Sequence, residues 1–358
     1  AFSKAWDAAC RQAGNATFYV PEGTFLIGPV SFSGPCYNNQ SPNVEIKGTL
    51  MAPVRLNAFP HSNWIVFKNL NRISVTGGIE MGKIDGQGAA EAWKQVSCSH
   101  SMRCDTLVTS LKFTNVSSGT ISNIALANSK AFHLVIHNSD DIHVYDVKIT
   151  APGDSPNTDG IHISQSTNIY ITSSNIGVGD DCISIGQGSN NIIVSNVTCG
   201  PGHGISVGSL GKSSNEKDVT GIHVRNCTIN GTQNGIRIKT WPGAPVSSAS
   251  NLTYEDIAMI NVSNPIILDQ EYCPSRNCTI FFVVKPSLVM LSNIIIKNIT
   301  GTYNSNSAVA LLCSTGVPCE NIQLVDINLN NVVPENTRQG RLSVKGILNG
   351  LQVINSTF

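Results

Sequence analysis

A short pattern of residues recurs along this chain and constrains its fold more than any other feature. Each copy has a polar residue, often asparagine, followed by β-branched residues that alternate with polar ones. Clear copies are NVEI from Asn43, NIYITSSNI from Asn168, NIIVSNVTC from Asn191 and NIIIKNITG from Asn293. The copies are mostly separated by roughly 20 to 30 residues, the spacing of solenoid repeats. Alternation with a period of two predicts strands with one buried face.

These repeats predict a right-handed parallel β-helix. One copy has too little apolar surface to fold alone, so neighbouring copies must stack as coils that bury a continuous core. Asparagine suits tight left-handed turns, and stacked asparagines can form hydrogen-bonded ladders. A β-sandwich would instead favour hairpin turns at closer spacing. We expect a single all-β domain over residues 1–358, with a cap region at 1–40, a short capping helix from Phe2 to Cys10, and coils at 41–358.

Charge and apolar content argue against several kinds of partner. The chain has 23 basic and 23 acidic residues, so its formal net charge is zero. A neutral chain is a poor match for nucleic acid or for an anionic membrane. The longest apolar stretch, TIFFVVKPSLVML, is interrupted by Lys285 and Pro286 and is too short to cross a bilayer. We therefore expect neither nucleic acid nor a membrane as a partner.

The cysteines and glycosylation sequons indicate an oxidising compartment. The chain has 11 cysteines, several of them closely spaced, and Asn-x-Ser/Thr sequons are abundant. None of the cysteine pairs has zinc-finger spacing with nearby histidines, so a zinc site is the weaker interpretation. Disulfides and sequons together favour a secreted glycoprotein. No signal peptide is visible, and we expect the natural N-terminus to lie further upstream.

Four motifs interrupt the pattern of Ile, Val and Asn at regular spacing. They are NTDG at 157–160, GDDC at 179–182, GHG at 202–204 and RIK at 237–239. Asp159 and Asp180 are 21 residues apart, and Asp181 and His203 are 22 residues apart, which corresponds to one coil each. His203 and Arg237 are 34 residues apart, which fits one coil plus the inserted segment SLGKSSNEKDV. We expect these side chains to stack along one face.

The residue types in these motifs suit the hydrolysis of a glycosidic bond. That reaction needs one carboxyl group to protonate the leaving oxygen and another to activate water. Crowding of Asp180 and Asp181 favours this division, because one of two close acids tends to stay protonated. Adjacent strand residues point in opposite directions, so both acids reach one face only if the backbone bends there. Arg237 and Lys239, two apart on a strand, would bind a sugar carboxylate, and Tyr272 lies one coil further on.

Each motif alone is more often an ordinary turn or an exposed strand than part of a site. Because all four motifs occur in one chain and are separated by about one coil, we favour the interpretation that they form one active site.

Taken together, the four motifs resemble the signature of the polygalacturonases, glycoside hydrolase family 28. The resemblance implies hydrolysis of the α-1,4-linked galacturonic acid of homogalacturonan, with inversion and with no metal or other cofactor. It makes Asp180 the general acid, and Asp159 and Asp181 the residues that position and activate the water. His203 would support the protonation state of the acid or bind substrate. The substrate-binding residues that it implies are Asn157, Arg237, Lys239 and Tyr272.

Segments around the motifs resemble the plant members of the family, in particular pollen exopolygalacturonases, some of which are allergens. These segments are CGPGHGISVGSLGK, NLTYEDI, PIILDQEYCP and LLCSTGVPCENI. The resemblance implies exo action on pectin, a monomeric enzyme and an extracellular location in the plant cell wall, with inhibitor proteins of the wall as candidate partners. For the cysteines it implies the disulfides Cys10–Cys36, Cys98–Cys104, Cys182–Cys199, Cys273–Cys278 and Cys313–Cys319, with Cys227 as a buried free thiol.

Several alternatives stay open at this point. Endo action is one, because it depends on loops at the ends of the groove. Hydrolysis of rhamnogalacturonan or xylogalacturonan is another, although Arg237 and Lys239 favour plain galacturonan. A calcium-dependent pectate lyase and a non-catalytic wall-binding β-helix are more distant alternatives, and the second leaves the acids and the basic pair unexplained.

Overall fold

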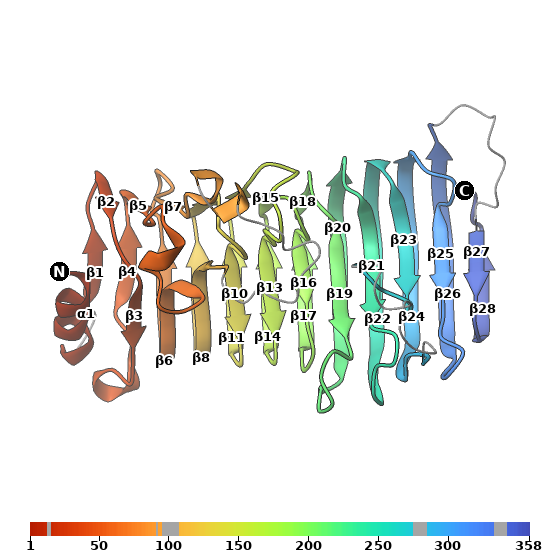
Figure 1. Cartoon of the computed structure of the whole chain (residues 1–358), viewed down its shortest axis with the longest axis horizontal. Helices are drawn as coiled ribbons and strands as arrows, with labels where there is room; N and C mark the ends of the chain where they lie inside the picture. Colours follow the sequence, from red (N-terminus) through yellow and green to blue (C-terminus); the bar gives the residue numbers. More distant parts are fainter. Residues whose placement is uncertain (13–15, 91, 95–106, 275–284, 333–341) are drawn as a thin grey trace. The chain divides into compact units, whose positions relative to one another are not determined.

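The computed structural model describes residues 1–12, 16–90, 92–94, 107–274, 285–332 and 342–358. The chain divides into two compact units, Ala1–Asp180 and Asp181–Phe358. Each unit consists of parallel strands that stack coil upon coil (Figure 1), so the predicted parallel β-helix is confirmed. That residues 1–358 form one domain stays a prediction.

The first unit begins with α1 (Phe2–Arg11), which ends one residue beyond the expected helix. Its strands are β1 (Thr17–Val20), β2 (Thr24–Leu26), β3 (Val30–Ser33), β4 (Asn43–Ile46), β5 (Thr49–Met51), β6 (Asn63–Thr76), β7 (Lys83–Asp85), β8 (Thr109–Ser122), β9 (Ala125–Ala127), β10 (Leu134–His137), β11 (Asp140–Tyr145), β12 (Lys148–Thr150), β13 (Ile161–Ser164), β14 (Thr167–Thr172) and β15 (Asn175–Gly177). Its short 3-10 helices are η1 (Tyr37–Asn39), η2 (Leu56–Ala58), η3 (Gly88–Ala90) and η4 (Ala92–Lys94).

The helix α1 covers the apolar core of the first coils. Trp6 and Cys10 are its buried residues. The Trp6 ring packs against Phe18 and Phe32, with ring centroids 6.1 and 5.1 Å away. A disulfide between Cys10 and Cys36 ties the helix to the segment after β3. The predicted capping helix is therefore present and covers core side chains.

Strands of successive coils in the first unit pair in parallel and in register. Val66, Lys112, Val135 and His162 are strand partners on β6, β8, β10 and β13. Strand residues alternate in direction, and Leu134, next to Val135, is fully buried in the core. The row that contains Lys112 and His162 therefore points away from the core, and the stacking places its members on neighbouring strands about 4.8 Å apart.

The second unit continues with strands of the same kind. They are β16 (Ile183–Ile185), β17 (Asn190–Ser195), β18 (Thr198–Cys199), β19 (Ile205–Leu210), β20 (Val219–Asn230), β21 (Asn234–Thr240), β22 (Ser247–Val262), β23 (Asn264–Asp269), β24 (Val289–Tyr303), β25 (Val309–Leu312), β26 (Cys319–Asn331), β27 (Leu342–Lys345) and β28 (Leu348–Ile354). The gap between β19 and β20 matches the expected insertion SLGKSSNEKDV.

Asparagine ladders form at the turns of both units, as the repeat pattern predicts. In the second unit Asn321 Nδ2 donates to Asn293 Oδ1 at 2.8 Å, and Asn293 Nδ2 donates to Asn251 Oδ1 at 3.4 Å. Their φ angles are 52°, 54° and 57°, in the left-handed region. Asparagine tolerates this conformation better than most residues, which explains why it recurs at one position of the coil.

Among the described residues, no helix is both long enough and apolar enough to cross a bilayer.

Candidate active site

The NTDG motif lies in the first unit, directly before β13. Asp159 is 5% exposed. Its backbone oxygen accepts hydrogen bonds from the backbone N–H and from Nδ1 of His133, both at 2.9 Å. The N–H of Ser129 donates to His133 Nε2 at 3.2 Å, so the geometry assigns the neutral tautomer with its proton on Nδ1. Burial lowers the pKa of His133 to about 4, and this histidine therefore holds the motif as an uncharged donor.

A backbone bend carries the first acid of the GDDC motif. Gly179 and Asp180 form this bend after β15, and Asp181 follows it and precedes β16. The Gly179 N–H donates to Thr158 Oγ1 at 3.0 Å. A Cβ atom at Gly179 would lie 1.9 Å from the backbone oxygen of Ser155, so glycine alone fits this close approach. The bend that two adjacent acids require is therefore present.

Asp181 lies in the second unit, where two cations and a hydroxyl hold its carboxylate. The side chain of Arg237 donates from a terminal nitrogen to Oδ1 at 2.6 Å, and Lys239 Nζ donates to Oδ2 at 2.7 Å. Ser206 Oγ also donates to Oδ1 at 2.7 Å and accepts from Arg237 Nε at 3.1 Å. Asp181, Arg237 and Lys239 are 2%, 8% and 5% exposed. These four residues form one buried ionic cluster, which we name the Asp181 cluster.

The charge state of Asp181 follows from this cluster. Burial on its own would raise the pKa of the Asp181 carboxyl. The charges of Lys239 and Arg237, together with hydrogen bonds from Lys239 and Ser206, outweigh burial and hold that pKa well below its usual range. Asp181 is therefore ionised near neutral pH, where it is a candidate proton acceptor and not a proton donor.

Strand register explains why these four residues meet. Ser206 on β19 is the strand partner of Arg237 on β21. Arg237 and Lys239 are two apart on β21, so both side chains leave the same side of the strand, as predicted. They reach Asp181 across 56 and 58 residues of sequence.

His203 is held between two glycines of the second unit. Gly202 forms an isolated parallel bridge with Thr232. Gly204 has a φ of 85°, and a Cβ there would lie 2.1 Å from the backbone oxygen of Asn234. Both glycines thus approach the neighbouring coil closely, while the His203 side chain is half-buried. The two glycines of the GHG motif let the backbone on either side of His203 pack closely against the neighbouring coil.

Aromatic rings border the Asp181 cluster. The Tyr272 ring lies over both cations, with its centroid 5.3 Å from Lys239 Nζ and 6.0 Å from Arg237 Cζ. Trp241 packs edge-on against Tyr272, at a centroid distance of 5.5 Å. The prediction that Tyr272 follows the RIK motif on the next coil agrees with this contact.

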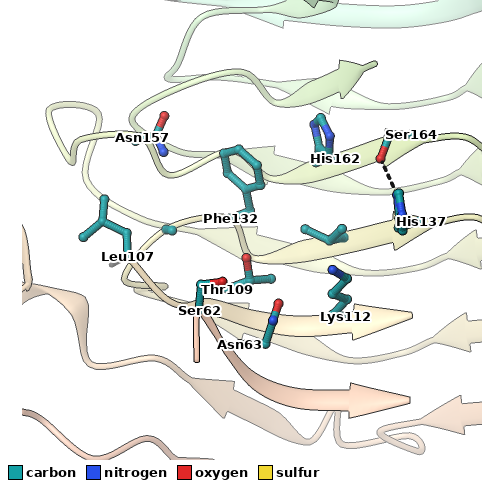
Figure 2. Close-up of a pocket in the computed structure, with 12 residues that line it drawn as sticks. Ser62, Asn63, Leu107, Thr109, Lys112, Phe132, His137, Asn157, His162 and Ser164 are labelled. Atoms are coloured by element: carbon teal, nitrogen blue, oxygen red, sulfur yellow. Dashed lines mark hydrogen bonds between the residues drawn. The ribbon is translucent and has the colours of Figure 1, made fainter. Parts of the chain in front are cut away.

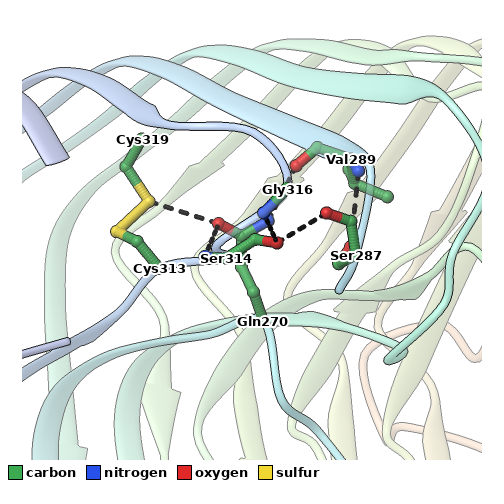
Figure 3. Close-up of a disulfide and its surroundings, with 7 residues drawn as sticks. All are labelled: Gln270, Ser287, Val289, Cys313, Ser314, Gly316 and Cys319. Atoms are coloured by element: carbon green, nitrogen blue, oxygen red, sulfur yellow. Dashed lines mark hydrogen bonds between the residues drawn. A yellow bond between two sulfur atoms is a disulfide. The ribbon is translucent and has the colours of Figure 1, made fainter. Parts of the chain in front are cut away.

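A buried polar network beside a disulfide holds Gln270, at the end of the strand that leads to Tyr272 (Figure 3). Gln270 is 1% exposed, and its Oε1 accepts the Ser314 N–H at 3.0 Å. The disulfide Cys313–Cys319 closes the turn next to this contact. This buried, hydrogen-bonded network holds Gln270, which lies two residues before Tyr272.

Comparison with known proteins identifies the family. The sequence matches the glycosyl hydrolases family 28 model over residues 10–342. This chain belongs to glycosyl hydrolase family 28. It is 44% identical over 352 residues to an exopolygalacturonase of Arabidopsis thaliana, covering 98% of this chain and 77% of that protein. It is 43% identical over 330 residues to an exopolygalacturonase of Platanus acerifolia, covering 92% and 85%.

A solved structure shows the same fold in a distant relative. The polygalacturonase of Erwinia carotovora superposes with a TM-score of 0.74 at 22% identity, covering 97% of this chain and 93% of that one. The family resemblance that the four motifs indicated is therefore confirmed, and the chain is a glycosyl hydrolase.

The disulfides of this family member agree with the pairing that the resemblance implied. Cys10–Cys36, Cys182–Cys199 and Cys313–Cys319 are joined. Cys227 is a buried free thiol, as expected, and burial raises its pKa to about 11. The pair Cys98–Cys104 lies outside the described residues, and so does Cys278, the expected partner of Cys273.

Two residues of the site were not anticipated from the sequence. Ser206 joins the Asp181 cluster, and His133 supports the backbone of Asp159. Ser206 could have been found, because it lies on the strand that follows GHG, one coil before Arg237. His133 sits in an ordinary stretch, AFHLVI, and no signal in the sequence marks it.

Proposed function

We propose that this family 28 hydrolase cleaves the α-1,4-D-galacturonosidic linkages of homogalacturonan from a chain end, with inversion and without a metal. The observation that carries the substrate assignment is the identity of 43–44% to proteins named exopolygalacturonases over more than nine-tenths of the chain. The exo assignment rests on those names together with the plant-like segments around the motifs.

The roles of the three acids follow from the chemistry of inversion. An inverting glycosidase needs one protonated carboxyl for the leaving oxygen and one carboxylate that activates water on the opposite face. Asp181 has its pKa held low by Lys239 and Arg237, so it fits the second role and not the first. We assign Asp180 as the general acid, with Asp159 assisting Asp181 at the water.

Arg237 and Lys239 then have two tasks. As predicted, they would attract the carboxylate of a galacturonate, because they place two positive charges against the single charge of Asp181. Their contacts with Asp181 add a task that the sequence did not indicate, which is to keep this base ionised. Asp269 is the strand partner of Lys239. Burial raises the pKa of the Asp269 carboxyl, so this group is less fully ionised at acidic pH than an exposed aspartate.

The remaining assignments complete the proposal. His203 would tune the protonation of Asp180 or bind substrate, and Asn157 and Tyr272 would contact the sugar. Metal independence is supported by the Asp181 cluster, since both oxygens of that carboxylate already accept hydrogen bonds from cations. The disulfides support a secreted enzyme that acts in the cell wall.

Digestion of hexagalacturonate in the presence of a chelator tests this proposal. Size analysis of early products should give saturated galacturonate monomer and pentamer. A ladder of intermediate sizes would replace exo action by endo action. Unsaturated products that absorb in the ultraviolet and require calcium would show a lyase, and no cleavage at all would contradict the substrate assignment.

A further inference from the structure

The proposed function gives no task to one buried hydroxyl of the site, that of Ser206. Asn157, which lines an open cavity of about 390 Å³ in the first unit (Figure 2), would contact the sugar. Asp181 would activate water, and Arg237 would bind a carboxylate and keep Asp181 ionised. Ser206 makes hydrogen bonds to both Asp181 and Arg237, so its contribution to the reaction can be worked out from these contacts.

Ser206 points away from the core of its coil and is nevertheless fully buried. Its neighbours on β19, Ile205 and Val207, are core residues that are each 1% exposed. Side chains alternate along a strand, so Ser206 leaves the opposite side, the side of its strand partner Arg237 on β21. Its exposed fraction is 0%. A hydroxyl at such a position needs hydrogen-bond partners, and Asp181 and Arg237 provide them.

The hydrogen bonds of Ser206 have a defined direction. A guanidinium group has donors and no acceptor, so Arg237 Nε donates to Ser206 Oγ, at 3.1 Å. The proton of the hydroxyl is therefore the one that Ser206 donates to Asp181 Oδ1, at 2.7 Å. A terminal nitrogen of Arg237 donates to the same Oδ1 at 2.6 Å. The three contacts close a ring that joins one carboxylate oxygen, one hydroxyl and one guanidinium group.

This ring restricts the orientation of the Asp181 carboxylate. The terminal torsion of an aspartate side chain has a broad distribution, so contacts with neighbours must fix the plane of the carboxylate. The ring holds Oδ1, and Lys239 Nζ holds Oδ2 at 2.7 Å. A general base is effective only when it lies within hydrogen-bond reach of the proton that it takes and is correctly oriented. The contacts of Ser206 are therefore of the kind that such a base requires.

We propose that Ser206 is a positioning residue for hydrolysis, whose hydroxyl holds the Asp181 carboxylate and the Arg237 guanidinium in one mutual orientation for the activation of water. The inference rests on the proposed function, in which Asp181 is the base. Ser206 acts through Asp181 and not on the substrate. Its loss therefore slows the chemical step more than it weakens the binding of substrate.

Steady-state kinetics on hexagalacturonate test this role. Ser206→Ala removes one donor to Asp181 Oδ1 and the acceptor of Arg237 Nε. We expect kcat to fall about tenfold, which corresponds to about 1.4 kcal/mol, while KM changes by less than about twofold. Ser206→Thr keeps the hydroxyl and should recover most of the lost rate.

Ser174→Ala is the matched control for the loss of a buried hydroxyl. Ser174 is 4% exposed, and its Oγ donates to the backbone oxygen of Thr172 at 2.7 Å in the first unit. This variant should keep the wild-type kcat. Thermal melting of all variants shows whether each one is folded at the temperature of the assay.

A nitrophenyl galacturonide provides the second arm, because its leaving group departs without protonation while water must still be activated. Ser206→Ala should lose about the same factor on this substrate as on hexagalacturonate. A loss confined to hexagalacturonate would connect Ser206 with the general acid and overturn the proposal.

Two further results would overturn the role of Ser206 and leave the proposed function intact. One is a folded Ser206→Ala that cleaves hexagalacturonate as fast as Ser174→Ala, and the other is a folded Ser206→Thr that is no faster than Ser206→Ala. If the wild-type chain does not cleave hexagalacturonate, the proposed function fails and this inference fails with it.

Discussion

Replacing Lys239 by methionine probes the Asp181 cluster most informatively. Methionine keeps much of the length of the side chain but removes the ammonium that donates to Asp181 Oδ2 at 2.7 Å. The carboxylate would retain Arg237 and Ser206 as donors. The change therefore weakens the cluster without leaving the buried acid entirely unpaired.

The size of the effect follows from burial. Breaking a buried ion pair by removing one partner typically costs about 3–5 kcal/mol, because a charge is left behind. Since two donors to Asp181 remain, we expect the free energy of unfolding at pH 7 to fall by about 3 kcal/mol, at the low end of that range.

The pH dependence of this loss has a definite sign. The folded-state pKa of Asp181 is depressed, so its carboxylate contributes stability that is present above the unfolded pKa of about 3.9. That contribution disappears as the pH falls through the lower folded pKa. The difference between wild type and Lys239→Met should therefore be largest at neutral pH and should shrink as the pH falls below about 4.

Urea unfolding of wild type and variant at pH 7 and at pH 3 measures both quantities. Lys297→Met is the matched control, because Lys297 Nζ makes a 2.6 Å ion pair with Glu255 while its side chain is 48% exposed. We expect a much smaller loss for this pair than for Lys239→Met, because its lysine is exposed to solvent. A loss in Lys239→Met no larger than in Lys297→Met, or one independent of pH, would refute the view that the cluster holds Asp181 ionised.

Three further predictions concern the coils around the site. Because burial lowers the pKa of His133 to about 4, the wild-type free energy of unfolding should fall by about 3 kcal/mol between pH 7 and pH 4 relative to His133→Asn; parallel curves would contradict this. Cys182→Ser removes the disulfide Cys182–Cys199, which closes a loop of 17 residues beside the site. The free energy of unfolding should fall by about 2–5 kcal/mol, and an unchanged value in chemical unfolding would show that this disulfide does not stabilise the fold. Gly179→Ala places a Cβ 1.9 Å from the backbone oxygen of Ser155 and should lower the melting temperature markedly, whereas Gly28→Ala, with no neighbouring atom within 4 Å, should not.

The fold was predictable because each coil repeats the same sequence pattern, an asparagine followed by alternating apolar and polar residues. The left-handed turns need asparagine or a similar residue, and the core needs alternating Ile and Val. Asn251, Asn293 and Asn321 therefore mark the coils directly, and the structure stacks them as a ladder. The amphipathic pattern of the first residues also predicted the helix α1, with an error of one residue at its end.

Part of the candidate site was predictable, since Asp181, Arg237, Lys239 and Tyr272 were expected on neighbouring coils and do lie together. Coil spacing indicated that the acids, His203 and the RIK motif share a face. It could not show that Arg237 and Lys239 both bond to Asp181, because that depends on strand register across 56 and 58 residues.

The assignment of Asp180 as the general acid is tested most directly by comparing two substrates with Asp180→Asn. Hexagalacturonate has a poor leaving group that needs protonation, whereas a nitrophenyl galacturonide has a leaving group that departs without it. General acid catalysis contributes about 10²–10⁴-fold, so the variant should lose about this factor on hexagalacturonate and far less on the nitrophenyl substrate. Equal losses on both substrates, or full activity on hexagalacturonate, would contradict the account.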